Sequence, residues 1–429
     1  MEKNEEIRRE LTDHIAPFWT SLRDDVYGGW YGYLSYDLQL DKKAEKGCIL
    51  NSRITWFFTN LYMLTGDAKY LEQARHGYEF MMDHCLDREK GGVFWSVDYA
   101  GKPLDTTKHT YNQAFAIYAL SSWYDATGDE KARRLAEELF DLIESKCRDD
   151  GGYLEAFDRD FLPASNEKLS ENGVMAARTM NTLLHVIEGY TELYRVTKDG
   201  RVGDALSDAL CILADRMYNP EKHREEVFFD REYHSLIDLY SYGHDIETSW
   251  LADRALEVLE GRGPKTIFGA GGLKAASAEN EAASHAETVS AGKPEYLKTV
   301  QKVRPVLADL TCQVYAEPFS YTGESLPTEC EKGVVNQVRV WWVQCEGIIG
   351  FVNGFQRDGK PEYLDAAKKL WQYTKTHMID PRKGSEWFWD LHEDGTPREG
   401  RPIVEPWKCP YHNGRMCMEI LRRGIEITK

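Results

Sequence analysis

The 429-residue chain predicts an all-α fold built from helical hairpins, and three patterns support this prediction. Turns that combine Gly with Asp recur between helical segments. Aromatic, almost wholly apolar segments alternate with charged amphipathic segments. Short loops that contain Gly-Gly recur along the chain. A repeated supersecondary unit is the simplest account of all three patterns.

Gly and Asp mark the turns inside each predicted hairpin. Gly tolerates the left-handed backbone that ends one helix, and the Asp side chain caps the start of the next. The aromatic segment after Arg53 is apolar around most of its circumference, which is typical of a buried helix, whereas segment 131–143 has one apolar face. We expect outer helices like the second to cover inner helices like the first. The turns lie at residues 65–67, 127–129, 198–200 and 357–359, with an echo at 291–293.

Six inner helices are predicted, with starts near Arg53, His109, Arg178, His244, Arg339 and His412. Gly-Gly loops at 28–29, 91–92 and 151–152 are followed by short alternating runs that indicate small β-hairpins. Six pairs can close into an (α/α)6 barrel with the inner helix ends around a pocket. An open solenoid of hairpins would show the same periodicity. We predict the closed barrel of six helical hairpins with short β-hairpin loops.

One segment departs from the repeat, from about residue 261 to 337. It contains a stretch rich in Ala, Ser and Glu at 275–290 and a Lys-Pro-Glu-Tyr-Leu run. We interpret it as an outer helix enlarged by an insertion, within a single domain over residues 1–429. It is either a variable surface excursion, which loops tolerate, or a lid or interface.

Composition limits the partners. The net charge of −18 disfavours nucleic acid and anionic membranes, because binding phosphates needs clustered Lys and Arg. No apolar stretch is long enough to span a bilayer, and the charged N-terminus has no apolar signal core. We expect a cytoplasmic protein, a monomer or weak homodimer, with free thiols and a neutral substrate. The 12 Trp and 24 Tyr suit either a sugar-binding cleft or a helical core.

Three histidines, His185, His244 and His412, lie in predicted inner helices of different repeats. A repeat that places a special residue at the same end of each helix can bring those residues to one centre. Histidine takes and gives protons near neutral pH, so the pattern indicates proton transfer. Singly, each His would more often be a hydrogen-bonded structural residue. A three-His zinc site is the other alternative, which the lack of metal-ligand spacing disfavours.

Other polar and aromatic residues fall at matching places. Asn181, His185 and Glu188 share one helical face, and Glu247 lies three residues after His244, where it would hold the ring and raise its basicity. Each of these residues has a structural alternative, such as a core Trp or a salt bridge at a helix start. Further candidates at inner helix starts are Arg53, Tyr111, Asn112, Trp341, Trp342, Glu346, Trp407 and Arg415.

Seven motifs resemble the N-acylglucosamine 2-epimerase superfamily, and within it the cellobiose 2-epimerases. They lie at residues 51–53, 109–116, 170–173, 180–185, 241–247, 340–344 and 407–415, and the likeness covers nearly the whole chain. Segment 261–337 is longer than this family leads us to expect. The resemblance implies an (α/α)6 barrel that interconverts the reducing-end glucose and mannose of β-1,4-linked disaccharides, without cofactor and without metal.

The resemblance also implies the roles of single residues. His244 and His412 would be the acid/base pair at C2, and Arg53 would bind the oxygens of the open-chain intermediate. His185, Asn181, Tyr111 and Glu247 would position the reducing-end sugar or assist ring opening. The apolar walls and stacking platforms would be Trp341, Trp342 and Trp407.

The residue types agree with that chemistry. Only an open-chain aldehyde acidifies the C2 proton, and the enediolate formed by its removal needs a cation such as Arg. Reprotonation from the opposite face needs an acid, so two imidazoles that flank C2, one neutral and one protonated, meet both requirements. Three alternatives stay open: an N-acylglucosamine epimerase or aldose–ketose isomerase on a monosaccharide, a non-catalytic sugar-binding protein, and an inverting glycosidase that uses paired carboxylates among Asp158, Asp160 and Glu386.

Overall fold

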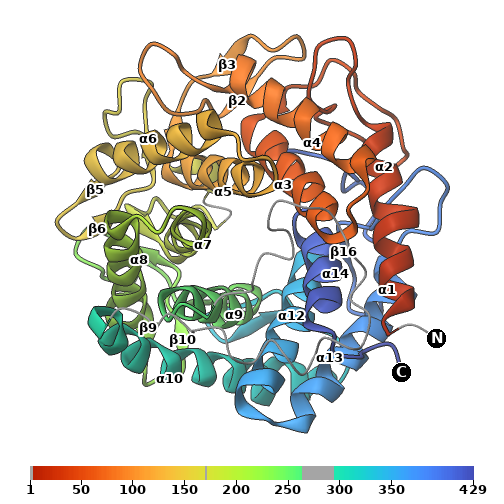
Figure 1. Cartoon of the computed structure of the whole chain (residues 1–429). Helices are drawn as coiled ribbons and strands as arrows, with labels where there is room; N and C mark the ends of the chain where they lie inside the picture. Colours follow the sequence, from red (N-terminus) through yellow and green to blue (C-terminus); the bar gives the residue numbers. More distant parts are fainter. Residues whose placement is uncertain (1–2, 170–171, 263–293) are drawn as a thin grey trace, which may run out of the picture.

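The structure is a computed structural model that describes residues 3–169, 172–262 and 294–429. Its helices form two concentric rings (Figure 1). The aromatic helices line the inner ring, as the sequence predicts, although Arg53 lies within the first of them rather than at its start. The inner helices are α3 (Cys48–Thr65), α5 (Thr110–Thr127), α7 (Met180–Thr197), α9 (Tyr242–Leu259), α12 (Trp341–Asp358) and α14 (His412–Arg423).

The outer helices cover the inner ring with one apolar face. In the outer helix that spans Glu130–Lys146, the buried residues follow a helical spacing from Ala132 through Leu139 to Ile143. π-helical turns extend four outer helices: η2 (Met81–Cys85), η4 (Leu213–Met217), η6 (Tyr315–Phe319) and η7 (Thr374–Met378). The outer helices are α4 (Ala68–Phe80), α6 (Glu130–Lys146), α8 (Gly200–Ile212), α10 (Leu297–Val314) and α13 (Pro361–Tyr373).

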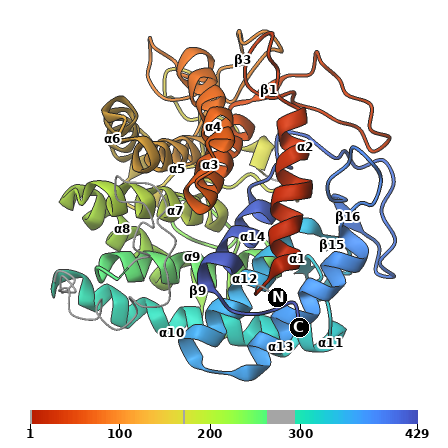
Figure 2. The ribbon, with the colours of Figure 1, turned by 45° about the vertical axis from the view of Figure 1, so that its right-hand side comes forward.

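The two ends of the chain close the ring. α14 packs between α3 and α12, and the N-terminal helix formed by α1 (Glu5–Arg9), η1 (Glu10–Ile15) and α2 (Ala16–Ser21) covers it from outside (Figure 2). The Asn4 amide joins the termini, because it donates to the Ile425 carbonyl at 2.7 Å and accepts from the Ile427 amide at 3.0 Å. The closed (α/α)6 barrel is therefore confirmed, and its sixth hairpin combines the first and last helices.

The predicted Gly and Asp turns have the expected Asp cap except at 357–359, where Gly359 is left-handed but Asp358 ends α12 and Lys360 precedes α13 without a side-chain cap. Gly66 and Gly128 end inner helices in the left-handed region, at φ 70° and 71°. Asp67, Asp129 and Asp199 cap the next helices by accepting from a backbone amide two residues later. In the third turn the glycine follows the aspartate, so Gly200 is the first residue of α8. The left-handed residue that ends α7 is instead Lys198, at φ 56°.

Buried lysines hold two of the Gly-Gly loops against the inner helices. The Lys46 ammonium donates to the Asp24 carboxylate at 2.6 Å and to the Gly28 carbonyl at 2.7 Å. Lys108 repeats the arrangement, at 3.1 Å from the Asp87 carboxylate. Each lysine lies two residues before the start of an inner helix, so the buried ion pair ties the loop to that helix start. Removing one partner of such a pair is strongly destabilising.

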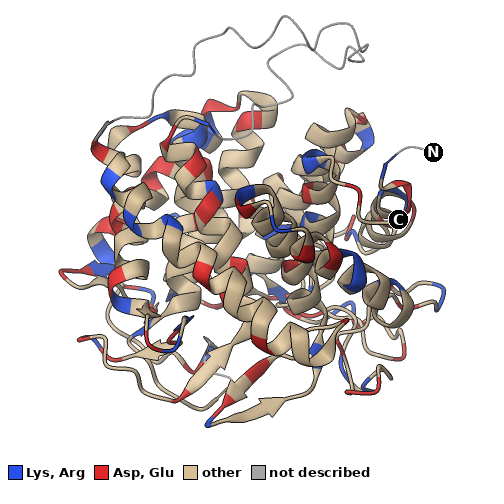
Figure 3. Ribbon diagram, turned by 90° about the horizontal axis from the view of Figure 1, so that it is seen from below, with Lys and Arg blue, Asp and Glu red and all other residues tan. Residues whose placement is uncertain are grey.

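The strands are short and lie at one end of the helical ring, as the side view in Figure 3 shows. That figure also shows acidic and basic residues interspersed over the outer helices. Among the described residues no helix is both long and apolar enough to cross a membrane. The strands that pair before inner helices are β1 (Lys46–Gly47) with β2 (Ser96–Val97), β4 (Lys108–His109) with β7 (Ala156–Phe157), β8 (Arg178–Thr179) with β11 (Phe228–Phe229), and β15 (Arg339–Val340) with β16 (Asp390–Leu391).

The segment from 261 to 337 contributes α10 and a β-hairpin. Residues 263–293, which include the predicted stretch at 275–290 and the turn echo at 291–293, lie outside the described residues. β13 (Glu329–Glu331) and β14 (Val334–Asn336) pair with each other, and β13 also pairs with β12 (Leu239–Ser241). Since β12 leads directly into α9, the hairpin braces the start of that inner helix.

Candidate active site

The N-terminal ends of the inner helices open on one cavity of about 200 Å³. The ten residues to which the resemblance assigns roles all line this cavity, although they come from six helices and one loop, whereas the other candidates Asn112, Glu188, Glu346 and Arg415 do not line it. The ten are Arg53, Tyr111, Asn181, His185, His244, Glu247, Trp341, Trp342, Trp407 and His412. The repeat brings them together because each lies at or near the N-terminal end of an inner helix, or just before one.

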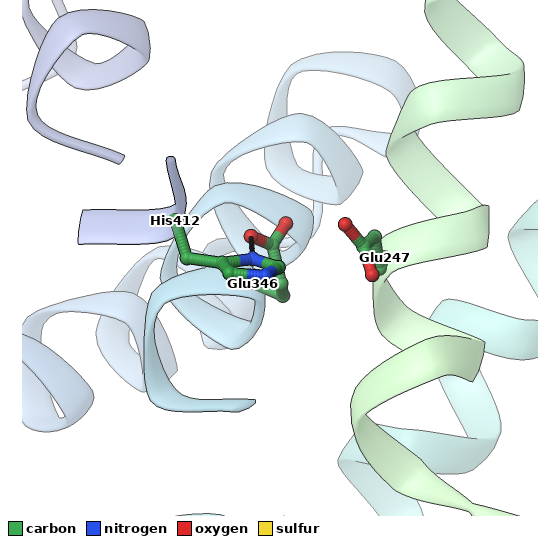
Figure 4. A group of neighbouring side chains, drawn as sticks. All are labelled: Glu247, Glu346 and His412. Carbon is green, nitrogen blue, oxygen red and sulfur yellow. Dashed lines mark hydrogen bonds and ion pairs between the residues drawn. The ribbon is translucent and has the colours of Figure 1, made fainter. Parts of the chain in front are cut away.

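His412 begins α14 and is held by a carboxylate from the neighbouring helix. Its Nδ1 lies 2.7 Å from Oε1 of Glu346, which is fully buried on α12 (Figure 4). Burial lowers the pKa of His412 well below its usual value, and the cations of Arg415 and Arg53 lower it further. The imidazole is therefore neutral near pH 7, with a carboxylate in place to support the imidazolium when it forms.

His185 has a carboxylate partner on its own helix. Its Nδ1 lies 2.9 Å from Oε2 of Glu188, three residues later. Glu188 also accepts from the Tyr411 hydroxyl at 2.5 Å and from Arg415 at 2.6 Å. Burial alone would raise the pKa of Glu188, but Arg415, His185 and Tyr411 together lower it to about 2. Burial lowers the pKa of His185 despite the opposing effect of this carboxylate.

His244 has a neutral partner, which corrects one expectation. The spacing in the sequence predicts that Glu247 holds this ring, but Nδ1 of His244 lies 2.6 Å from the Ser241 hydroxyl. Glu247 instead accepts from Arg415 at 2.5 Å, because one turn of helix directs it toward the barrel centre. Burial, and then the nearby His185, lower the pKa of His244 to about 3. This imidazole is neutral at physiological pH, and its hydrogen-bond partner is a hydroxyl that cannot stabilise a charged form as a carboxylate does.

The indole of Trp342 packs near two of the histidines. Its ring centroid is 4.8 Å from that of His244 and 5.5 Å from that of His412. These two imidazoles, which come from α9 and α14, therefore approach the same part of the cavity. A sugar carbon placed there would have one proton-transfer group from each helix.

Arg53 supplies a buried cation to the cavity. Its guanidinium donates to the Tyr111 hydroxyl at 2.5 Å and lies over the rings of Phe115 and Tyr411, at 4.1 and 4.7 Å from their centroids. The aromatic walls fix the plane of the guanidinium. Within the described part of the chain its hydrogen bonds go to a hydroxyl and a backbone carbonyl rather than to a carboxylate, so its charge is available to an oxyanion.

Asn181 also presents an unused polar atom. Its Oδ1 is buried and has no hydrogen-bond partner among the described residues. A buried acceptor without a partner is costly unless a ligand or water completes it. Since Asn181 lines the cavity, a sugar hydroxyl is a suitable donor to this oxygen.

One group of side chains has the spacing of metal ligands. Ligand atoms of Glu247, Glu346 and His412 all lie within 4.8 Å of one another, and Figure 4 shows Glu247 reaching from α9 toward the other two. Arg415 donates to Glu247 at 2.5 Å and to Glu346 at 2.8 Å, so both carboxylates already have a buried cationic partner. The absence of a metal stays a prediction, to be tested with chelators.

Several cavity residues are not identifiable from sequence patterns. Trp389 packs against Trp341 with centroids 4.5 Å apart and the rings tilted by 54°, and the Arg401 guanidinium lies over Trp389, 4.8 Å from its centroid. These residues belong to loops without helical periodicity, and only the Trp-rich run at 387–389 gives a signal. Asn172, Ser241 and Val340 lie inside the motifs, but the resemblance assigns them no role. The other cavity residues, which lie outside the motifs, are Lys168, Thr179, Val227, Phe228, Leu239, Thr328 and Glu329.

These features define a class of protein. An (α/α)6 barrel carries a sugar-sized cavity with aromatic walls, a fixed guanidinium and two neutral imidazoles that approach one point. The site is built to move protons at a carbon next to a carbonyl, as a carbohydrate epimerase does.

Comparison with known proteins gives the family. The sequence model described as N-acylglucosamine 2-epimerase (GlcNAc 2-epimerase) matches residues 29–289 and 290–412, so the chain belongs to this family. It is 48% identical to cellobiose 2-epimerase of Eubacterium cellulosolvens, over 99% of this chain and 100% of that protein. It is 46% identical to cellobiose 2-epimerase of Ruminococcus albus, over 98% and 99%. A solved structure of a sugar epimerase from a ruminal bacterium superposes with a TM-score of 0.88 at 44% identity, covering 98% of this chain and 99% of that one.

Proposed function

We propose that this protein interconverts the reducing-end glucose and mannose of β-1,4-linked disaccharides such as cellobiose and lactose. The observation that carries the proposal is the approach of His244 and His412, from two different helices, to the indole of Trp342 in a cavity that Arg53 also lines. The similarity over full length to proteins named cellobiose 2-epimerase supports the same reaction.

The reaction begins with opening of the sugar ring, which exposes an aldehyde at C1 and acidifies the proton at C2. A neutral imidazole removes this proton, and the electron pair forms an enediolate whose negative oxygen lies toward the Arg53 guanidinium. The other imidazole returns a proton to C2 from the opposite face. To do so it must be an imidazolium, so one of the two rings carries an extra proton when the reaction begins. At His412 the Glu346 carboxylate supports that charge. Burial favours the neutral form of both His244 and His412, which makes either ready to act as base.

The other cavity residues position the substrate. We assign His185, Asn181, Tyr111 and Glu247 to the hydroxyls of the reducing-end sugar and to ring opening. The indoles of Trp341, Trp342 and Trp407 form apolar walls against the sugar faces. An N-acylglucosamine epimerase or an aldose–ketose isomerase would need only one sugar ring, whereas the additional cavity residue Trp389 favours a disaccharide.

The carboxylates considered for an inverting glycosidase have other partners. Glu386 is fully buried, and it accepts from Lys408 at 2.8 Å and from Trp19 at 2.7 Å. Asp160 pairs with Lys90 on the surface, and Asp158 accepts backbone amides in its own loop. Because none of the three lines the cavity, these groups do not form a catalytic pair there.

One incubation tests the proposal. Cellobiose, lactose, glucose, mannose and N-acetylglucosamine are each incubated with the protein in deuterated water. We expect the 2-epimer of the disaccharides, with deuterium at C2. Shorter sugars would indicate a glycosidase, and unchanged sugars would indicate a binding protein. Turnover of monosaccharides alone would indicate an N-acylglucosamine epimerase or an aldose–ketose isomerase.

Variants then assign the residues. We expect His244→Ala and His412→Ala each to abolish deuterium incorporation while the circular dichroism spectrum stays that of the folded protein. Activity in either variant would remove that histidine from the acid/base pair. A single domain over residues 1–429, a monomeric or weakly dimeric state and a cytoplasmic location are further predictions, checked by limited proteolysis, gel filtration and cell fractionation.

A further inference from the structure

Ser241 occupies a helix-capping position without capping the helix. It is the last residue of β12 and the N-cap residue of α9, yet its side chain accepts no backbone amide of that helix. Its hydroxyl instead lies 2.6 Å from Nδ1 of His244. Serine at an N-cap normally accepts from the amide two or three residues later, so this hydroxyl is diverted from its ordinary use.

The neighbouring repeat shows the ordinary use. Thr179 ends β8 and is the N-cap of α7, the same position in the hairpin, and its hydroxyl accepts from the Thr182 amide at 3.0 Å. The two helices therefore differ in the hydrogen-bond partner of the hydroxyl at the N-cap. In α7 the hydroxyl stabilises the helix end, whereas in α9 it holds an imidazole.

The partner of His244 also differs from those of the other two cavity histidines. His185 and His412 face the carboxylates of Glu188 and Glu346, which favour a positive imidazolium. A hydroxyl carries no charge, so it orients the ring without favouring the protonated form. The titratable groups that act on His244 from other helices are His185 and Glu346. His185 is hydrogen-bonded to Glu188, and Glu346 is hydrogen-bonded to His412, so neither is the hydrogen-bond partner of His244.

The β-hairpin of segment 261–337 keeps Ser241 in place. Ser241 pairs with Glu329 across the ladder between β12 and β13, and Ser241 is almost fully buried. Thr328 and Glu329 also line the cavity. This part of the segment thus supports the wall from which His244 projects.

We propose that Ser241 is the positioning residue of His244: its hydroxyl oxygen accepts a hydrogen bond from Nδ1–H and leaves the Nε2 lone pair toward the cavity, so that neutral His244 is the base for the epimer whose C2 hydrogen faces it. The proposal rests on the proposed epimerase function for its kinetic consequence. Its structural part, the tautomer of one imidazole, is independent of any activity.

The kinetic test uses Ser241→Ala. Without the hydroxyl the ring loses its fixed tautomer, so we expect kcat to fall by at least about 10-fold, since a wrong tautomer can cost up to about 10⁴-fold. The effect should be larger on kcat than on KM, because the hydroxyl is hydrogen-bonded to the imidazole, and the melting temperature should fall less than in a variant that loses a helix cap. The matched comparison is Thr179→Ala, which removes a working cap and should lower the melting temperature.

The direct test is nitrogen NMR on protein labelled with ¹⁵N-histidine, with the His244 signals assigned by their loss in His244→Gln. Wild type should show His244 protonated on Nδ1, and Ser241→Ala should change its pattern. Ser241→Thr, which keeps a hydroxyl, should restore the wild-type pattern. Unchanged signals in Ser241→Ala, or wild-type kcat in that variant, would overturn the proposal. If wild type epimerises no sugar, the proposed function fails and the NMR result still decides the role of Ser241.

Discussion

Replacing Glu188 by Gln tests whether one buried carboxylate supports both the stability of the barrel and the orientation of His185. The side chain accepts from His185, Tyr411 and Arg415, and a glutamine keeps its shape but not its charge. A pKa of about 2 in place of 4.5 corresponds to about 3 kcal/mol of preference for the ionised form. Losing one partner of a buried ion pair costs about 3–5 kcal/mol. Since Arg415 keeps Glu247 and Glu346, we expect a loss of about 3 kcal/mol, at the lower end of that range.

The pH dependence provides the check on this magnitude. A depressed carboxyl pKa adds stability that is fully present above about pH 4.5 and is lost as the pH falls toward about 2. Urea unfolding of wild type and Glu188→Gln should therefore differ by about 3 kcal/mol at pH 7 and converge at low pH. Equal stability at pH 7, or a difference that persists unchanged near pH 2, would refute the reasoning.

A matched control lies one turn further along α7. Glu192 also has a pKa lowered to about 2, by Arg195 and Arg254 against the effect of burial, and its hydrogen bonds go to these two arginines rather than to a cavity histidine. Glu192→Gln should lose a similar amount of stability and keep the wild-type kcat. Glu188→Gln should lower kcat by about 10-fold as well, because the His185 ring loses its partner. Equal kcat in both variants would contradict the positioning role of Glu188.

Three other predictions concern the reaction. Because burial lowers the pKa of His244 to about 3 and that of His412 in the same direction, kcat/KM should show no acid-side fall centred near pH 6.5. As the pH falls through about 6.5, the free energy of unfolding should decrease, because these histidines bind protons in the unfolded chain and stay neutral in the folded one. The pH–rate profile checks the first expectation, and unfolding curves measured at several pH values check the second. Arg53→Lys should lower kcat by about 10²-fold in initial-rate assays, because a flexible ammonium replaces a fixed oxyanion donor; wild-type kcat would exclude this role. Dialysis against EDTA should leave the rate unchanged, and a loss restored by a divalent ion would place a metal at Glu247, Glu346 and His412.

The sequence determined the helices and the general place of the site. Periodicity of apolar residues separates buried inner helices from one-faced outer helices, and Gly and Asp punctuate the turns through local backbone preferences. These signals depend only on residues near one another in the chain. The repeat then places special residues at equivalent helix ends, which is why the sequence predicts that Arg53, His244 and His412 share one cavity, and all three line it. Their roles in the reaction stay predictions.

Only the tertiary structure decided which groups touch. The sequence left open whether the hairpins close into a ring, because closure depends on contacts between residues as distant as Asn4 and Ile425. Sequence proximity predicts that His244 hydrogen-bonds to Glu247. In the structure the hydrogen-bond partner of His244 is Ser241, and Glu247 accepts from Arg415. Hydrogen bonds form between atoms that are close and correctly oriented, and for a buried network drawn from several helices that geometry follows from packing rather than from spacing along the chain.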